Sequence, residues 1–153
     1  LSLHAAIYRA KAGDVIVVEA SPDYANAGGN VCAIAKQRGV VAMIIDGFIR
    51  DIGEIREAQF PIYARGLMPK PGAKEQMFPL NQPIQCGGVT VNAGDYIVAD
   101  EEGIAVIPKD KLTEVYKLAK ARTDKDASMN LADWKVQHSK KVESKLQELG
   151  YFD

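Results

Sequence analysis

The sequence predicts an α/β protein with a mixed parallel and antiparallel sheet and helices at its C-terminal end. Three observations lead to this fold class. Up to about residue 66, short apolar segments alternate with helical patterns, which is typical of a parallel sheet covered by helices. Short segments separated by turn residues then continue to Pro108 and indicate antiparallel hairpins. Beyond Pro108 the apolar residues recur at helical spacing.

The first part of the chain is expected to form the parallel sheet. The β-branched run Val15–Val18 predicts a strand buried on both faces. Pro22 and Asn26 break regular structure and predict a loop around them. Gly39 suits the left-handed conformation that ends a helix. The elements predicted in order are a helix at 1–10, a strand at 15–18, a loop at 21–27, a helix at 30–38, a strand at 40–45, a turn at Asp46-Gly47, a helix at 51–58 and a strand at 61–64.

The remainder of the chain is expected to change from hairpins to helices. Asn92-Ala-Gly-Asp95 and Asp100-Glu-Glu-Gly103 are turn sequences, and they separate strands at 89–91, 96–99 and 104–107. Leu112, Val115 and Leu118 share one helical face. Residues 124–130 form a polar break before a last helix that ends at Gly150, in which Trp134 is predicted to be a packing anchor.

Length and composition limit the classes of protein that fit. The chain has 153 residues, which suits a single domain over residues 1–153 with a helical extension at 109–153. A formal net charge of -1 argues against nucleic-acid or membrane partners, and the longest apolar run, Val40–Ile45, is too short to span a bilayer. Two cysteines without metal-ligand spacing suggest a reducing compartment and a cytoplasmic location.

Arg50-Asp51 is the first candidate site, because it follows the apolar strand and the turn at Asp46-Gly47. Ligands of α/β sheets bind at the carboxyl ends of strands, so these side chains are placed where a ligand is expected. Arg50 suits a planar carboxylate, and Asp51 can bind a hard cation such as Mg²⁺. The alternative is a surface arginine beside an aspartate that caps a helix; Asp51 and Glu54 both suit the dipole of that helix.

Gly28-Gly29 is the second candidate site. A helix beginning near Asn30 leaves backbone N–H groups unpaired, and glycines let an anion approach them closely. The turn is neither a GxGxxG motif nor a P-loop, and a tight strand-to-helix connection is the alternative. We interpret Asp46-Gly47 as a turn rather than a catalytic site, and find no Ser/His/Asp or Cys/His arrangement.

Several motifs, taken in order along the chain, carry a resemblance to a known family. Together they resemble the RraA-like family, which contains the 4-hydroxy-4-methyl-2-oxoglutarate / 4-carboxy-4-hydroxy-2-oxoadipate aldolases, the regulator of ribonuclease E activity, and members formerly labelled demethylmenaquinone methyltransferases. The resemblance covers about Leu1–Pro108. The motifs are Gly13-Asp-Val-Ile-Val-Val18, Gly28-Gly29, Ala35-Lys-Gln-Arg-Gly39, Ile45-Asp-Gly-Phe-Ile-Arg-Asp51, Phe60-Pro-Ile-Tyr-Ala-Arg-Gly66, Cys86-Gly-Gly-Val-Thr-Val91, Gly94-Asp95 and Ala99-Asp-Glu-Glu-Gly-Ile104.

The resemblance implies a swivelling β/β/α fold, assembled as trimers or hexamers with the active site between subunits. It implies that Gly28, Gly29, Asn30 and Val31 bind a pyruvyl carboxylate, that Arg50 holds the substrate and that Asp51 anchors Mg²⁺ or Mn²⁺. In the aldolases the metal polarises the 2-oxo group and stabilises a pyruvate enolate without a Schiff base. We therefore expect a metal-dependent class II aldolase that releases pyruvate from 4-hydroxy-2-oxo acids, with oxaloacetate decarboxylase activity as a further expectation.

Some family features separate the alternatives. The ribonuclease regulator tends to lack an Asp after the Arg, so Asp51 favours the lyase over a non-catalytic regulator. Nothing in the sequence resembles a methyltransferase site. Compared with the family, an N-terminal segment is missing. Asp124 or Asp126 could match an acidic residue that the family places near the metal on a neighbouring subunit.

Overall fold

The computed structural model describes residues 1–151. Its contacts divide the chain into two compact units, Leu1–Lys109 and Asp110–Asp153, and each is considered by itself. The first unit carries the sheets and the predicted site residues. The second unit consists of helices.

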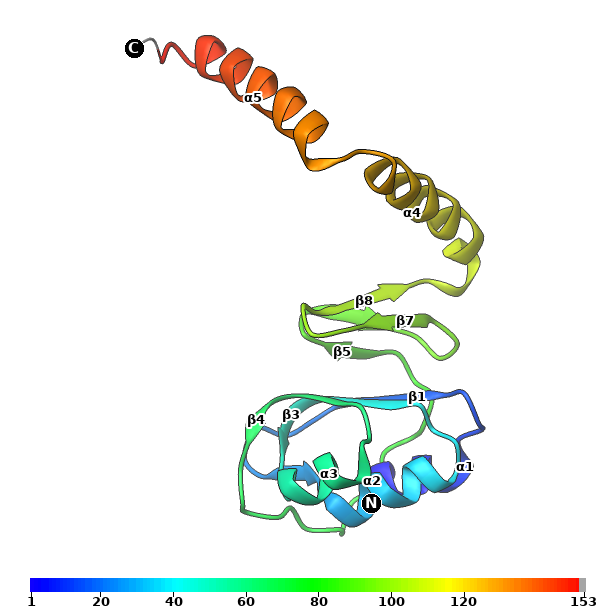
Figure 1. Cartoon of the computed structure of the whole chain (residues 1–153). Helices are drawn as coiled ribbons and strands as arrows, with labels where there is room; N and C mark the ends of the chain where they lie inside the picture. Colours follow the sequence, from blue (N-terminus) through cyan, green and yellow to red (C-terminus); the bar gives the residue numbers. More distant parts are fainter. Residues whose placement is uncertain (152–153) are drawn as a thin grey trace. The chain divides into compact units, whose positions relative to one another are not determined.

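A parallel four-stranded sheet forms the centre of the first unit (Figure 1). β3 is the central strand. β4 pairs along one edge of β3, while β1 and β2 pair with successive parts of the other edge. β1 and β3 are rich in β-branched and other apolar residues, which suit the centre of a covered sheet. The strands are β1 (Val15–Glu19), β2 (Ala25–Ala27), β3 (Ala42–Ile49) and β4 (Ile62–Leu67).

Three helices cover one face of this sheet (Figure 1). They are α1 (Ser2–Arg9), α2 (Gly29–Gln37) and α3 (Ile52–Ala58). Alternate residues of the strands point to opposite faces, so one set packs against the helices. The resulting core consists of Ile7, Ile16, Ala27, Cys32, Ala35, Val40, Met43, Ile45, Ile49, Ile55 and Phe60.

Two antiparallel hairpins lie on the opposite side of the sheet from the helices (Figure 1). Gly87 and Gly88 both have positive φ and form the turn between the first pair of strands. The pairs are β5 (Ile84–Cys86) with β6 (Val89–Val91), and β7 (Tyr96–Ala99) with β8 (Ile104–Ile107). β5 lies against β1 of the parallel sheet.

The second unit contains two helices that bury none of their residues. They are α4 (Leu112–Ala127) and α5 (Leu131–Glu148), and a short 3₁₀ helix, Lys109–Lys111, comes before α4. The side chain of Asn130 caps α5 by accepting from the backbone N–H of Asp133 at 2.9 Å. Among the described residues, no helix has the length and apolar character needed to cross a membrane.

The predicted mixed α/β fold with C-terminal helices is confirmed, with corrections to individual elements. The predicted loop at 21–27 contains β2, because a short strand of three residues has little sequence signal. Ile16 is the one buried residue of β1, since the strand has no neighbour beyond β3 within its sheet. α4 continues into the predicted polar break and ends at Ala127, which leaves only residues 128–130 between the two helices. Trp134 is half exposed and stacks on His138, with ring centroids 4.4 Å apart.

The predicted turn at Asp46-Gly47 is also wrong, because both residues lie inside β3. The pairing between β3 and β4 is Ile45 with Ala64 and then Phe48 with Gly66. Asp46 and Gly47 therefore face a single residue of β4, Arg65, as in a β-bulge. An Asp-Gly pair is a strong turn signal, and here the bulge accounts for it within a strand.

Candidate active site

The predicted site residues meet at the carboxyl edge of the parallel sheet. Gly28 separates β2 from α2, while Arg50 and Asp51 separate β3 from α3. Because β2 and β3 are parallel neighbours, their carboxyl ends share one edge. The backbone N–H of Arg50 donates to the carbonyl of Ala27 at 3.0 Å and joins the two connections directly.

Asp51 holds an unusual position between β3 and α3. Its φ of 58° and ψ of 40° place it in the left-handed region, which residues other than glycine rarely occupy. Its Oδ2 accepts from the backbone N–H of Gly29 at 3.2 Å. The carboxylate therefore caps α2, whereas the sequence pattern indicated a cap on α3. Strained backbone of this kind is concentrated at functional sites.

Arg50 lies beside this carboxylate. Its Nε is 3.4 Å from Oδ2 of Asp51, and the two side chains are 42% and 37% exposed. An ion pair with that exposure contributes little to stability. The Arg50 side chain has no other ion pair or hydrogen bond within residues 1–151, so the rest of its planar fork is available to an anionic ligand.

Gly28 and Gly29 have a steric reason to be glycine. A Cβ on Gly28 would clash with Oδ2 of Asp51 and lie 3.0 Å from Nε of Arg50. A Cβ on Gly29 would clash with the side chain of Glu54. The predicted tight connection and the predicted close approach of an anion are therefore both present, but in this structure the anions at the turn are the chain's own carboxylates.

Glu54 was not among the predicted site residues. It lies in the first turn of α3, and its side chain reaches the start of α2 at Gly29. The sequence signal was its spacing of three residues from Asp51, which puts both on one helical face. That signal supported only a helix-dipole interpretation, because the packing of α3 against α2 cannot be derived from local sequence.

The structure places Asn30 and Val31 in the first turn of α2. The first hydrogen bond along this helix joins the N–H of Cys32 to the carbonyl of Gly28 at 3.1 Å. The N–H of Gly29 is occupied by Asp51, while those of Asn30 and Val31 come too early in the helix to have a partner within it. These two N–H groups can therefore receive an anion.

The carboxylates at this edge suit a divalent cation that keeps most of its waters better than one enclosed by protein ligands. No group of three or more His, Cys, Asp or Glu side chains gathers anywhere in the described chain. Oδ1 of Asp51 accepts no hydrogen bond from residues 1–151, and Glu54 brings a second carboxylate to the same turn. Mg²⁺ is commonly held by one or two carboxylates together with waters and substrate oxygens, which this donor set allows.

Cys32 lies beneath the site in α2 and is fully buried. Burial, and then the charge of Asp51, raise the pKa of its thiol to about 11. Because the thiolate is the reactive form, Cys32 does not act as a nucleophile near neutral pH.

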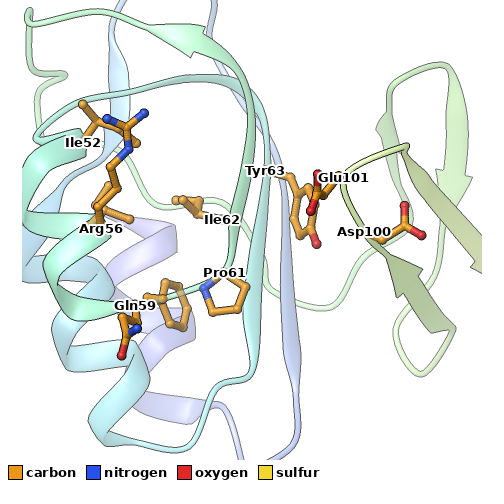
Figure 2. A pocket seen from close by; sticks show the side chains of 10 residues that line it. Ile52, Arg56, Gln59, Pro61, Ile62, Tyr63, Asp100 and Glu101 are labelled. Atoms are coloured by element: carbon orange, nitrogen blue, oxygen red, sulfur yellow. The ribbon is translucent and has the colours of Figure 1, made fainter.

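A cavity lies elsewhere, against α3 and β4 (Figure 2). It has a volume of about 320 Å³ and is lined by residues of α3 and β4 together with Asp100 and Glu101. Ile52 lines this cavity, but Arg50 and Asp51 do not. Most of its lining surface is apolar, and it includes none of the predicted site residues, so it is not the candidate site.

Asp124 and Asp126 lie in the second unit, on α4. Oδ1 of Asp124 accepts from Nζ of Lys120 at 2.8 Å, and Oδ2 of Asp126 accepts from Nε of Arg122 at 3.0 Å. Both are exposed pairs between successive turns of one helix. Their predicted role near a metal of another subunit stays a prediction.

A family model described as RraA-like, Aldolase/RraA, matches residues 1–106. Among proteins of known name, a "Putative 4-hydroxy-4-methyl-2-oxoglutarate aldolase" of Halalkalibacterium halodurans is 39% identical over 134 residues, which cover 86% of this chain and 64% of the relative. The 4-hydroxy-4-methyl-2-oxoglutarate aldolase of Thermus thermophilus is 32% identical over 100 residues, covering 64% of this chain and 61% of the relative.

A solved structure also resembles the chain. Streptomyces coelicolor RraAS2, described as an unusual member of the RNase ES inhibitor RraA protein family, superposes with a TM-score of 0.75. It is 31% identical, and the match covers 82% of this chain and 66% of that one. The chain thus spans less than two thirds of the length of the curated relatives that it matches.

Proposed function

The chain belongs to the RraA-like family, and we propose that it is a divalent-metal-dependent carbon–carbon lyase that releases pyruvate from 4-hydroxy-2-oxo acids. The single observation that carries the proposal is the meeting of Arg50 and Asp51 at the N-terminus of α2. One side chain suits a carboxylate substrate and the other a hard cation. The names of the aldolase relatives support the reaction class.

The roles of the residues follow from their chemistry. The unpaired N–H groups of Asn30 and Val31 bind the carboxylate of the pyruvyl half, aided by the positive end of the helix dipole. Arg50 holds oxygens of the same substrate and balances negative charge that develops during the reaction. Gly28 and Gly29 keep the space above the turn free of side-chain carbon.

Asp51 and Glu54 are the residues that would hold Mg²⁺ or Mn²⁺. When bound there, the cation supplies Lewis-acid polarisation of a 2-oxo group and lowers the pKa of bound water. The cap that Asp51 provides to α2 uses only Oδ2, so Oδ1 is the oxygen assigned to the cation. The same groups suit decarboxylation of oxaloacetate, which is also a 2-oxo acid.

Pyruvate release from 4-hydroxy-4-methyl-2-oxoglutarate is the test. We expect activity that EDTA abolishes and Mg²⁺ or Mn²⁺ restores, together with a loss of at least about a hundredfold in the Asp51→Asn variant. Asp14→Asn is the matched control, because Asp14 lies in the turn before β1, at the opposite edge of the sheet. Full activity after complete metal removal would contradict the proposal.

A non-catalytic regulator is the second candidate, favoured by the structural similarity to RraAS2. A ribonuclease inhibition assay with the Asp51→Asn variant separates the two. The regulator predicts inhibition that is independent of Asp51 and no pyruvate release from the unmodified chain.

We also propose that three or six copies assemble, with the site shared between subunits, as the family resemblance implies. The exposed side chains of Arg50 and Asp51 leave room for a second copy to cover them. Size-exclusion chromatography with activity assayed across the fractions tests this, and a fully active monomer would contradict it.

A further inference from the structure

We propose that Glu19 and Asp46 form a carboxylate clamp that binds two backbone N–H groups of the β5–β6 hairpin, one in β5 and one in the turn that follows it. The clamp fixes the β5–β6 hairpin on the face of the parallel sheet that the helices leave open. The proposal concerns residues outside the candidate active site and does not depend on the proposed reaction.

The clamp is defined by two hydrogen bonds to backbone N–H groups. Gln85 N–H donates to Oε2 of Glu19 at 2.9 Å, and Gly87 N–H donates to Oδ2 of Asp46 at 2.9 Å. Gln85 lies in β5, whereas Gly87 lies in the turn that follows the strand, with a φ of 59°. β5 pairs with β6.

The two acceptors are neighbours in the parallel sheet. Glu19, at the end of β1, is the register partner of Asp46 in β3. Side chains of paired residues stand on the same face, about 4.8 Å apart in the hydrogen-bonding direction. The two neighbouring carboxylates therefore reach two donors that are two residues apart on the hairpin.

Arg65 of β4 lies beside Asp46, on the adjacent strand opposite to that of Glu19. Its Nε donates to Oδ1 of Asp46 at 2.5 Å, which leaves Oδ2 for Gly87. Like charges on adjacent strands oppose one another, and the guanidinium offsets this repulsion. The side chain of Asp46 is only 16% exposed, so its hydrogen bonds are better shielded from water than those of an ordinary surface aspartate.

The hairpin has a physical need for such a clamp. A hairpin of two short strands is at best marginally stable in water, and an unpaired edge invites pairing with another chain. Charged acceptors form hydrogen bonds to N–H groups that are stronger than those of neutral acceptors. The two carboxylates satisfy one N–H group of β5 and one of its turn, and the same contacts hold the hairpin in place.

Hydrogen exchange of individual backbone amides, measured by NMR on the full chain, tests the clamp. In the Glu19→Ala, Asp46→Ala double variant we expect exchange at Gln85 and Gly87 to quicken by at least about tenfold, because each loses its acceptor. Exchange of Ile44 and Ile45 in β3 reports whether the sheet remains folded.

Asp95→Ala is the matched control, because Asp95 also accepts from two backbone N–H groups, those of Asn92 at 2.8 Å and Lys109 at 3.2 Å. It should quicken exchange at its own donors and leave Gln85 and Gly87 unchanged. If the double variant does not fold, Glu19→Ala alone must quicken exchange at Gln85. Unchanged exchange at Gln85 and Gly87 in a folded clamp variant overturns the proposal.

Discussion

The carboxylate of Asp51 caps a helix that begins 22 residues earlier in the sequence, by accepting the backbone N–H of Gly29 at 3.2 Å. This contact joins the two connections that the sequence singled out, one before α2 and one before α3. Because Asp51 also lies beside Arg50, the geometry of the cap determines where both charged groups stand. Substitutions on either side of this contact therefore test the geometry of the candidate site.

The first prediction concerns the glycine that faces Asp51. Gly28 has an extended backbone that any residue can adopt, so its replacement acts through space alone. In Gly28→Ala the added Cβ meets Asp51 and Arg50, and we expect a loss of about 1–3 kcal/mol in the free energy of unfolding, with a loss of activity. Urea denaturation and the pyruvate assay measure the two effects.

Gly53→Ala is the control for that prediction. Gly53 lies in α3, and a Cβ there meets nothing within 4 Å. Alanine favours a helix over glycine, so the variant should be unchanged or more stable by up to about 1 kcal/mol. Equal stability of the Gly28 and Gly53 variants would show that Asp51 does not lie against Gly28 in solution.

A second prediction separates the stability role of Asp51 from its chemistry. Asparagine keeps an oxygen acceptor for the N–H of Gly29 and tolerates left-handed backbone. The free energy of unfolding of Asp51→Asn should therefore lie within about 0.5 kcal/mol of that of the unmodified chain. Asp51→Ala loses the cap and keeps the unfavourable left-handed backbone at this position. Its free energy of unfolding should fall by about 2 kcal/mol. Urea denaturation measures both, and an equally destabilised asparagine variant would contradict the capping geometry.

Local sequence predicted most elements of the fold and proposed Gly28, Gly29, Arg50 and Asp51 for the candidate site, but it did not reveal their contacts. The placement of Arg50 and Asp51 after a buried strand follows from apolar patterning, which the sheet bears out. The left-handed backbone of Asp51 and its bond to Gly29 depend on how α3 packs against α2, and local pattern carries no information on that packing. For the same reason Glu54 was seen only as a helix-dipole residue.

Asp46-Gly47 shows the opposite limitation. The pair has the composition of a turn, but β3 passes through it because a bulge opposite Arg65 accommodates the extra residue. Pairing with β4 and the ion pair with Arg65 outweigh the local turn preference. Strand pairing of this kind joins segments far apart in sequence, and one sequence alone does not reveal it.

A third prediction concerns Cys32. With its pKa raised to about 11 by burial and by the charge of Asp51, its thiolate fraction at pH 8 is about one thousandth. In a Cys86→Ser variant, which leaves Cys32 as the only thiol, we expect no reaction with a thiol reagent in the native state and full reaction in denaturant. Rapid labelling of the native variant would contradict the burial of Cys32.

The last prediction is the pH dependence of Asp46. The hydrogen bond from Arg65 is the largest cause, followed by that from the N–H of Gly87, and together they hold the pKa of the Asp46 carboxyl below its usual value. Because this pKa is lower in the folded chain than in the unfolded chain, ionised Asp46 favours the folded state at pH values above the unfolded pKa. That contribution is lost as the pH falls through the folded pKa.

Replacing Arg65 by methionine removes the largest cause, so the pKa of Asp46 should rise and the pH at which its stabilisation is lost should rise with it. Titration of the Asp46 carboxyl carbon by NMR in the two chains measures the shift. Lys70→Met is the control, because it removes one positive charge from the same unit without touching Asp46. If Asp46 titrates at the same pH with and without Arg65, the ion pair between them does not persist in solution. Arg65 would then not hold Asp46 in position beside Glu19.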